Sequence, residues 1–132
     1  MEKRSYTNLQ HENMVRNQIA PFDVQMSAVL DAYREIPRDL FVPKHLKPIA
    51  YSDAFLEEED HYILFPAAYS ARLLQELNPQ SEENALVIGD KTGYMAAILG
   101  YLGLEVTYAE ENPKYRQAAA EAFKKLDLTS IT

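Results

Sequence analysis

Apolar residues in the first half of the chain recur at the three- and four-residue intervals that are typical of amphipathic helices. One helix is expected from about Thr7 to Ile19, since Pro21 follows and a residue before proline is disfavoured in helical geometry. A second helix is expected to begin after Asp23, as its N-cap, and to end at Pro37. The apolar stripe of this helix, which we assign to the core, is formed by Met26, Val29, Leu30 and Tyr33.

A segment rich in proline and turns follows, and within it Phe41 and Val42 are expected to fill the core. The acidic run over residues 57–60 is interpreted as a solvated turn, because four adjacent acids rarely converge on one metal ion. Pro66 suits the first turn of a third helix that runs to about Leu77. One face of this helix carries Tyr69, Leu73 and Leu77, which lie four residues apart.

From residue 85 onward the pattern alternates between strand and helix. The continuous apolar run Ala85–Ile88 predicts a strand that is buried on both faces. A helix from about Gly93 to Leu102, a strand from Leu104 to Ala109 and a helix opened by Asn112 and Pro113 should follow, with Thr129–Thr132 beginning a third strand. The side chains expected to face inward from the two helices are Ala97, Ile98, Tyr101, Tyr115, Ala119, Ala122 and Phe123.

This order of elements predicts an α/β fold in which N-terminal helices precede the first half of a doubly wound, Rossmann-like parallel sheet. We assign residues 1–80 to the helical segment and residues 81–132 to the Rossmann-like unit, within one structural domain. Only two or three strands fit into 132 residues, and a two-stranded sheet is marginal alone. The sequence therefore indicates either a piece of a longer protein or a homo-oligomer that covers the exposed sheet edge.

The composition of the chain disfavours several classes of function. The formal net charge of −7 disfavours a nucleic-acid partner, which needs clustered positive charge. The chain has no cysteine, which is compatible with a cytoplasmic location, and no apolar run long enough for a membrane-spanning helix. The three histidines are far apart without metal-ligand spacing, so no metal site is expected.

Two features lie where a parallel α/β unit binds a nucleoside. The turn from Gly89 to Gly93 follows the first strand, and Glu110 follows the second. An acid at that position accepts hydrogen bonds from ribose hydroxyls, and the distance of 21 residues along the chain agrees with the usual spacing of about 20. Lys91 stands where a dinucleotide fold has glycine, so a cofactor without phosphate, such as S-adenosylmethionine, is the better match.

Several segments together resemble the protein-L-isoaspartate O-methyltransferases, a family of class I methyltransferases, from about Glu12 onward. The segments with the highest specificity match the family patterns F-V-P and A-Y-x-D. The similar segments are NQI at 17–19, REIPRDLFVP at 34–43, AYSD at 50–53, ARLLQELNP at 71–79, VIGDKTGY at 87–94 and VTYAEENPKY at 106–115.

The resemblance implies methyl transfer from S-adenosyl-L-methionine to the free carboxylate of L-isoaspartyl residues in damaged proteins or peptides, which is a repair reaction. The cofactor would be lined by Gly89, Asp90, Gly93 and Glu110. The substrate entrance would be lined by Asp53, Tyr62 and Ile63. From the residues alone, Asp53 is equally interpretable as a turn cap, and core packing is the stronger interpretation for the other two.

The chain departs from the family pattern at several of these positions. The family segment T-I-S-Q-P reads YILFP here, so Leu64 replaces a serine that contributes to the active site, and the catalytic residue is left unassigned. Val87 replaces an acid and Lys91 replaces a glycine of the cofactor turn. Two alternatives stay open: a degenerate, non-catalytic member of the family, and a methyltransferase that acts on a different substrate.

Overall fold

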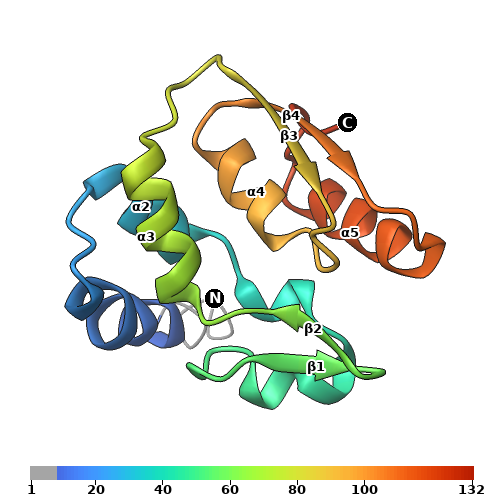
Figure 1. Cartoon of the computed structure of the whole chain (residues 1–132), viewed down its shortest axis with the longest axis horizontal. Coiled ribbons are helices and arrows are strands. Elements are labelled where there is room, and N and C mark those ends of the chain that lie inside the picture. The colour runs from blue at the N-terminus through green and yellow to red at the C-terminus, as the bar shows by residue number, and fades with distance from the viewer. Residues whose placement is uncertain (1–8) are drawn as a thin grey trace.

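The first helical stretch continues through the proline that was expected to stop it. The computed structural model describes residues 9–132, so the expected start at Thr7 lies outside the described part (Figure 1). Residues 9–14 are α-helical, the π-helical turn η1 covers Val15–Ile19, and the 3₁₀ turn η2 covers Ala20–Phe22. Pro21 lies at the start of η2, where its missing N–H leaves no bond unmade.

Helix α2, Ser27–Glu35, begins later than predicted and without the predicted cap. Asp23 adopts a left-handed conformation with φ of 64° and ends η2 instead of opening α2. The backbone N–H groups of Gln25 and Met26 donate instead to the side-chain oxygen of Gln75, at 2.6 and 2.9 Å. A side chain about fifty residues away therefore takes the place of a local cap.

A buried arginine organises the turns between α2 and the first strands. The 3₁₀ turns η3, Arg38–Phe41, and η4, Lys44–Ile49, follow α2, and Arg38 is fully buried. Its guanidinium donates to the carbonyl oxygen of Ala50 at 2.6 Å and to that of Phe65 at 2.7 Å. Phe41 and Val42 are buried, as predicted.

The acidic run is part of a β-hairpin and not a simple solvated turn. Strand β1, Leu56–Glu58, pairs antiparallel with β2, His61–Leu64. Glu59 and Asp60 form the connecting turn, both with positive φ, at 52° and 65°. Such two-residue turns usually contain glycine or asparagine, and the absence of either here removed the usual sequence signal.

Helix α3, Ala67–Leu77, forms where the sequence predicted it, with Pro66 as its N-cap residue. Its buried face is formed by small and aliphatic side chains, namely Ala67, Ala68, Ala71 and Leu74. The apolar stripe noted in the sequence lies on the opposite side, where Tyr69, Leu73 and Leu77 are 48 to 68 % exposed. One face of α3 is thus apolar and bare.

The second half of the chain forms the predicted α/β unit. Strand β3, Asn84–Ile88, pairs in parallel with β4, Glu105–Ala109. Helix α4, Tyr94–Tyr101, connects them, and α5, Pro113–Lys125, follows β4 with Asn112 as its N-cap. The third strand is reduced to a parallel bridge between Val106 and Ile131. Since this bridge is on β4, β3 is left with an unpaired edge among the described residues.

Only one face of this small sheet is covered. Helices α4 and α5 pack on the face that carries Val106 and Tyr108. The rings of Tyr108 and Phe123 are arranged edge-on, with their centroids 5.5 Å apart. On the other face Leu86 and Ile88 are 63 and 73 % exposed, so the prediction of a strand buried on both faces was wrong. The prediction for Tyr101 was also wrong, because its side chain is 43 % exposed.

No helix between residues 9 and 132 is both long and apolar enough to cross a lipid bilayer. In the same part of the chain, no three histidine, aspartate or glutamate side chains converge in a way that could hold a metal ion.

Gly93 and Gly89 provide a matched test of packing in the α/β unit. A Cβ atom at Gly93 would lie 2.7 Å from Ala119 Cβ and 2.9 Å from Phe123 Cζ, and φ is +84°. A Cβ atom at Gly89 would meet nothing within 4 Å, although φ is +76°. We expect Gly93→Ala to lower the free energy of unfolding by about 3 kcal/mol and Gly89→Ala by about 1 kcal/mol.

Urea unfolding of the two variants beside the unchanged chain measures both losses. Equal losses would contradict the packing role of Gly93, because the two positions share the backbone strain and differ in the space around them.

Candidate cofactor and substrate site

The site is built at the carboxyl ends of β3 and β4, where parallel α/β folds bind their ligands. Gly89 follows β3, and its N–H donates to the carbonyl oxygen of Ala109 at 3.2 Å, which continues the ladder by one bond. The space on the side-chain side of Gly89 is open. A ligand can therefore approach the backbone here more closely than any side chain would permit.

The Asp90 side chain stabilises the loop through hydrogen bonds to neighbouring residues. Its carboxylate accepts from the N–H of Ala96 at 3.2 Å and from the hydroxyl of Thr92 at 3.4 Å, so it faces the first turn of α4. Burial raises the pKa of Asp90. The Tyr108 hydroxyl donates to the Asp90 carbonyl oxygen at 2.5 Å and fastens the loop to β4.

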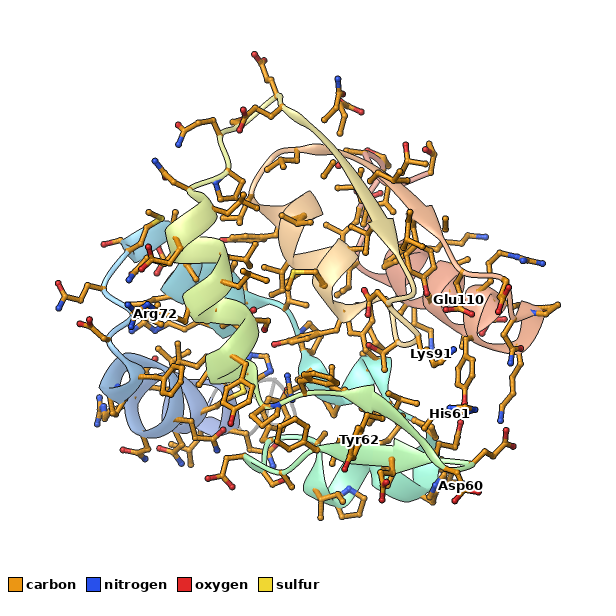
Figure 2. The ribbon with its side chains drawn as sticks, in the orientation of Figure 1. Asp60, His61, Tyr62, Arg72, Lys91 and Glu110 are labelled. Atoms are coloured by element: carbon orange, nitrogen blue, oxygen red, sulfur yellow. The ribbon has the colours of Figure 1, made fainter. Side chains whose placement is uncertain are left out.

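Glu110 supplies a buried carboxylate directly beside this loop. The residue is only 5 % exposed, and its Oε2 atom accepts from the N–H of Asn112 at 2.9 Å. The ammonium of Lys91 lies 3.9 Å from the same oxygen (Figure 2). Arg116 donates to the Glu110 carbonyl oxygen at 3.0 Å and so holds the backbone at this point. The Asn112 N–H and the Lys91 ammonium thus offset part of the cost of withdrawing this carboxylate from water.

Two cavities meet at the loop. The first, of about 620 Å³, is lined by Gly89, Lys91, Glu110 and Arg116 among others. The second, of about 310 Å³, lies between strand β2, helix α3 and the loop, and Gly89 and Lys91 line it too. Figure 2 shows Lys91 and Glu110 on the α/β unit, with Tyr62 on the hairpin below them. A ligand that extends over Gly89 can therefore occupy both cavities.

The second cavity is mainly apolar, and the buried residue Tyr94 contributes to its lining. The Tyr94 hydroxyl oxygen is withdrawn from solvent and has no hydrogen-bond partner in the described residues. Burial raises the pKa of Tyr94 to about 12, so the hydroxyl stays protonated at neutral pH. The Arg38 guanidinium lies 5.0 Å from the centre of the Tyr94 ring. By contrast, the Ser70 hydroxyl in this cavity is bonded to that of Tyr33 at 2.6 Å.

The structure brings together most of the residues that the sequence singled out. Gly89 and Asp90 belong to the loop, and Glu110 lies beside it. The second cavity is lined by Tyr62, Ile63 and Leu64. Ile63 and Leu64 are buried, whereas Tyr62 is 57 % exposed. Asp53 is exposed and lines neither cavity, and Gly93 packs against α5.

One contact that positions the hairpin had no signal in the sequence. Glu58, within the acidic run, has a side chain only 10 % exposed, and its carboxylate accepts from the Tyr115 hydroxyl at 2.8 Å. Lys114 lies 3.5 Å from the same carboxylate. Since 57 residues separate Glu58 from Tyr115, no local pattern could indicate that this acid anchors the hairpin to α5.

Comparisons with known proteins agree with this architecture. The family model described as protein-L-isoaspartate(D-aspartate) O-methyltransferase matches residues 9–132. Protein-L-isoaspartate O-methyltransferase 2 of Marinobacter nauticus is 36 % identical over 119 residues, which are 90 % of this chain and 53 % of that protein. Protein-L-isoaspartate O-methyltransferase of Protochlamydia amoebophila is 31 % identical over 90 % of this chain and 57 % of its own length.

A solved structure of a protein-L-isoaspartate O-methyltransferase superposes with a TM-score of 0.77 at 19 % identity, over 92 % of this chain and 40 % of that one, which supports the fold. The chain spans about half the length of the curated relatives it matches. Because the family model covers nearly all of it, the chain belongs to the protein-L-isoaspartate(D-aspartate) O-methyltransferase family.

Proposed function

We propose that this chain forms the cofactor-binding half of a protein-L-isoaspartate O-methyltransferase, which transfers a methyl group from S-adenosyl-L-methionine to the free carboxylate of L-isoaspartyl residues in damaged proteins. The main support is the placement of Gly89 beside Glu110, with a cavity on each side of the loop. In this proposal residues 81–132 hold the cofactor, residues 1–80 form the substrate side, and the protein acts in the cytoplasm.

The residues present fit an adenosyl cofactor. The carboxylate of Glu110 can accept hydrogen bonds from ribose hydroxyls, as acids at this position do in related α/β folds. The open backbone at Gly89 permits close approach. Both cavities fall within the range of about 300–1,000 Å³ that is usual for small-molecule sites. The Lys91 side chain limits how closely a ligand can approach the backbone of the loop. This limit is less of an obstacle to S-adenosylmethionine than to a cofactor with a pyrophosphate.

The reaction requires no strong general base from the protein. When bound, the cofactor supplies a methyl group that is activated by a sulfonium, and a substrate carboxylate is already ionised at neutral pH. The chain therefore contributes positioning and exclusion of water. Ile63 and Leu64 provide buried apolar walls for this purpose.

The acidic run does not oppose an anionic substrate in this cavity. Residues 57–60 are absent from its lining, and the Glu58 carboxylate is engaged by Tyr115 and Lys114. These acids therefore lie away from the place where we propose that an isoaspartyl carboxylate reacts.

Bare apolar surfaces support the proposal that further polypeptide completes the working enzyme. The exposed Ile88 lines the first cavity, and Tyr69 and Leu73 on the apolar face of α3 line the second, while β3 also has an exposed Leu86 and an unpaired edge among the described residues. Residues of this kind are buried in complete α/β sheets. We propose that they are covered either by additional chain of a longer protein or by a second copy in a homo-oligomer.

Two alternatives have specific support. Leu64 in place of serine and Lys91 in the cofactor loop favour a non-catalytic member that retains the fold. The apolar, aromatic lining of the second cavity, with Tyr62, Phe65 and Tyr69, favours a methyltransferase that acts on a different substrate.

Binding of S-adenosylhomocysteine tests the cofactor site. By isothermal titration calorimetry we expect a dissociation constant on the order of 1–100 µM for the chain. Glu110→Ala and Glu110→Gln should weaken binding by about tenfold or more, because hydrogen bonds to a charged acceptor are lost. Glu111→Ala is the matched control, since this acid also lines the first cavity but is exposed. Equal affinity in all variants would contradict the assignment of Glu110.

Methylation of an isoaspartyl peptide tests the reaction. We expect transfer of labelled methyl to the isoaspartyl peptide and none to the same peptide with normal aspartate, measured on this chain and on the longest native form of the protein. Cofactor binding without methylation of the isoaspartyl peptide by either form would favour a different substrate. A folded protein that binds no cofactor in either form would favour the non-catalytic alternative.

A further inference from the structure

The Lys91 side chain lies beside the Glu110 carboxylate, to which the proposed cofactor would bind. Its ammonium is 3.9 Å from Oε2 of Glu110 and 5.4 Å from the centre of the Tyr115 ring. The Lys91 side chain is 27 % exposed, whereas that of Glu110 is 1 % exposed. The lysine is therefore held over the acid by an ion pair and by the face of an aromatic ring, in a site partly shielded from water.

The position of Lys91 places it on the route between the two cavities. Both are lined by Gly89 and Lys91, and a smaller third cavity of about 100 Å³ against Tyr115 is lined by Lys91 as well. A ligand that reaches from Glu110 across Gly89 into the second cavity must pass the lysine. Its side chain therefore has to move or to share the carboxylate when such a ligand binds.

A ribose has two neighbouring hydroxyls, and the Glu110 carboxylate has two oxygens that can accept from them. Oε2 of Glu110 already accepts from the N–H of Asn112, so a pair of ribose hydroxyls that bonds both carboxylate oxygens competes with the ammonium at Oε2. An ion pair that is broken on binding subtracts from the affinity of the ligand. A lysine displaced from Glu110 can still lie over the Tyr115 ring.

We propose that Lys91 is an internal competitor for the ribose-binding carboxylate, and that it lowers the affinity of this chain for adenosyl ligands. The inference rests on the proposed function, because it assigns Glu110 to the ribose. It makes Lys91 a residue that sets which ligands, and at what concentration, enter the site.

The test compares lysine variants in their affinity for S-adenosylhomocysteine, measured by calorimetry. Lys91→Ala removes the competitor, and Lys91→Gln keeps most of the side-chain length without the charge. Both should bind about three- to tenfold more tightly than the unchanged chain, as expected for loss of a partly exposed ion pair. Thermal unfolding of each variant, with and without ligand, shows whether it is folded.

Lys114→Ala is the matched control. The Lys114 ammonium lies 5.5 Å from the centre of the same Tyr115 ring, but it pairs with Glu58 and Glu59 and not with Glu110. Its removal changes the net charge by the same amount close to the site. We expect the affinity for S-adenosylhomocysteine to be unchanged in this variant.

The dependence of S-adenosylhomocysteine affinity on salt distinguishes competition by Lys91 from a purely structural role of this residue. Added salt weakens the partly shielded pair between Lys91 and Glu110 only to a limited extent, so the affinity of the unchanged chain should rise slightly with ionic strength. The affinity of Lys91→Gln should stay level or fall. This opposite dependence on salt identifies competition by charge.

Equal or weaker binding by both folded Lys91 variants would overturn the inference while leaving the cofactor site in place. Absence of binding by the unchanged chain and by every folded variant would instead overturn the proposed function, and the inference with it. The two failures are distinguished by whether any form of the chain binds S-adenosylhomocysteine.

Discussion

The register between β3 and β4 is the constraint on which the site depends. Because Ile88 pairs with Ala109 in a parallel ladder, the next residues along each strand, Gly89 and Glu110, emerge side by side at one edge of the sheet. The bond from the Gly89 N–H to Ala109 holds this alignment one residue beyond β3. A slip of one residue would reverse which side chains face α4 and α5, so burial of Val106 fixes the register and, with it, the site.

The N-terminal half reaches this edge through buried polar contacts as well as through apolar packing. Arg38 binds the carbonyl oxygens of Ala50 and Phe65, which fixes the end of the hairpin and the start of α3 around one guanidinium. The same group lies over the Tyr94 ring at the beginning of α4. A buried guanidinium is costly to desolvate, and here Nε and Nη2 are bonded while Nη1 has no partner among the described residues. Phe65 and Tyr94, which this group contacts, both line the second cavity.

Local patterns predicted the parts of the fold that are determined locally. The alternation of strand and helix, the cap at Asn112 and the glycine turn all follow from short-range rules, and each forms as expected. The failures concern contacts made across the chain. Gln75 caps α2 from about fifty residues away, and Glu58 is buried by Tyr115 on α5. The apolar run of β3 predicted burial on both faces, because hydrophobicity shows that a surface needs cover and not which polypeptide provides it.

Two departures from the family pattern lie in the site and act in different ways. Lys91 brings an ammonium beside the buried carboxylate of Glu110 and offsets its charge, whereas Leu64 presents an apolar wall where the family pattern has a hydroxyl. Because the Glu110 side chain is shielded from water, the attraction within this pair is screened less than it would be on an open surface. A ligand that reaches the loop therefore meets the pair between Lys91 and Glu110. A ligand that occupies both cavities has to offer hydrogen-bonding groups to Glu110 and to extend past the largely apolar lining of the second cavity.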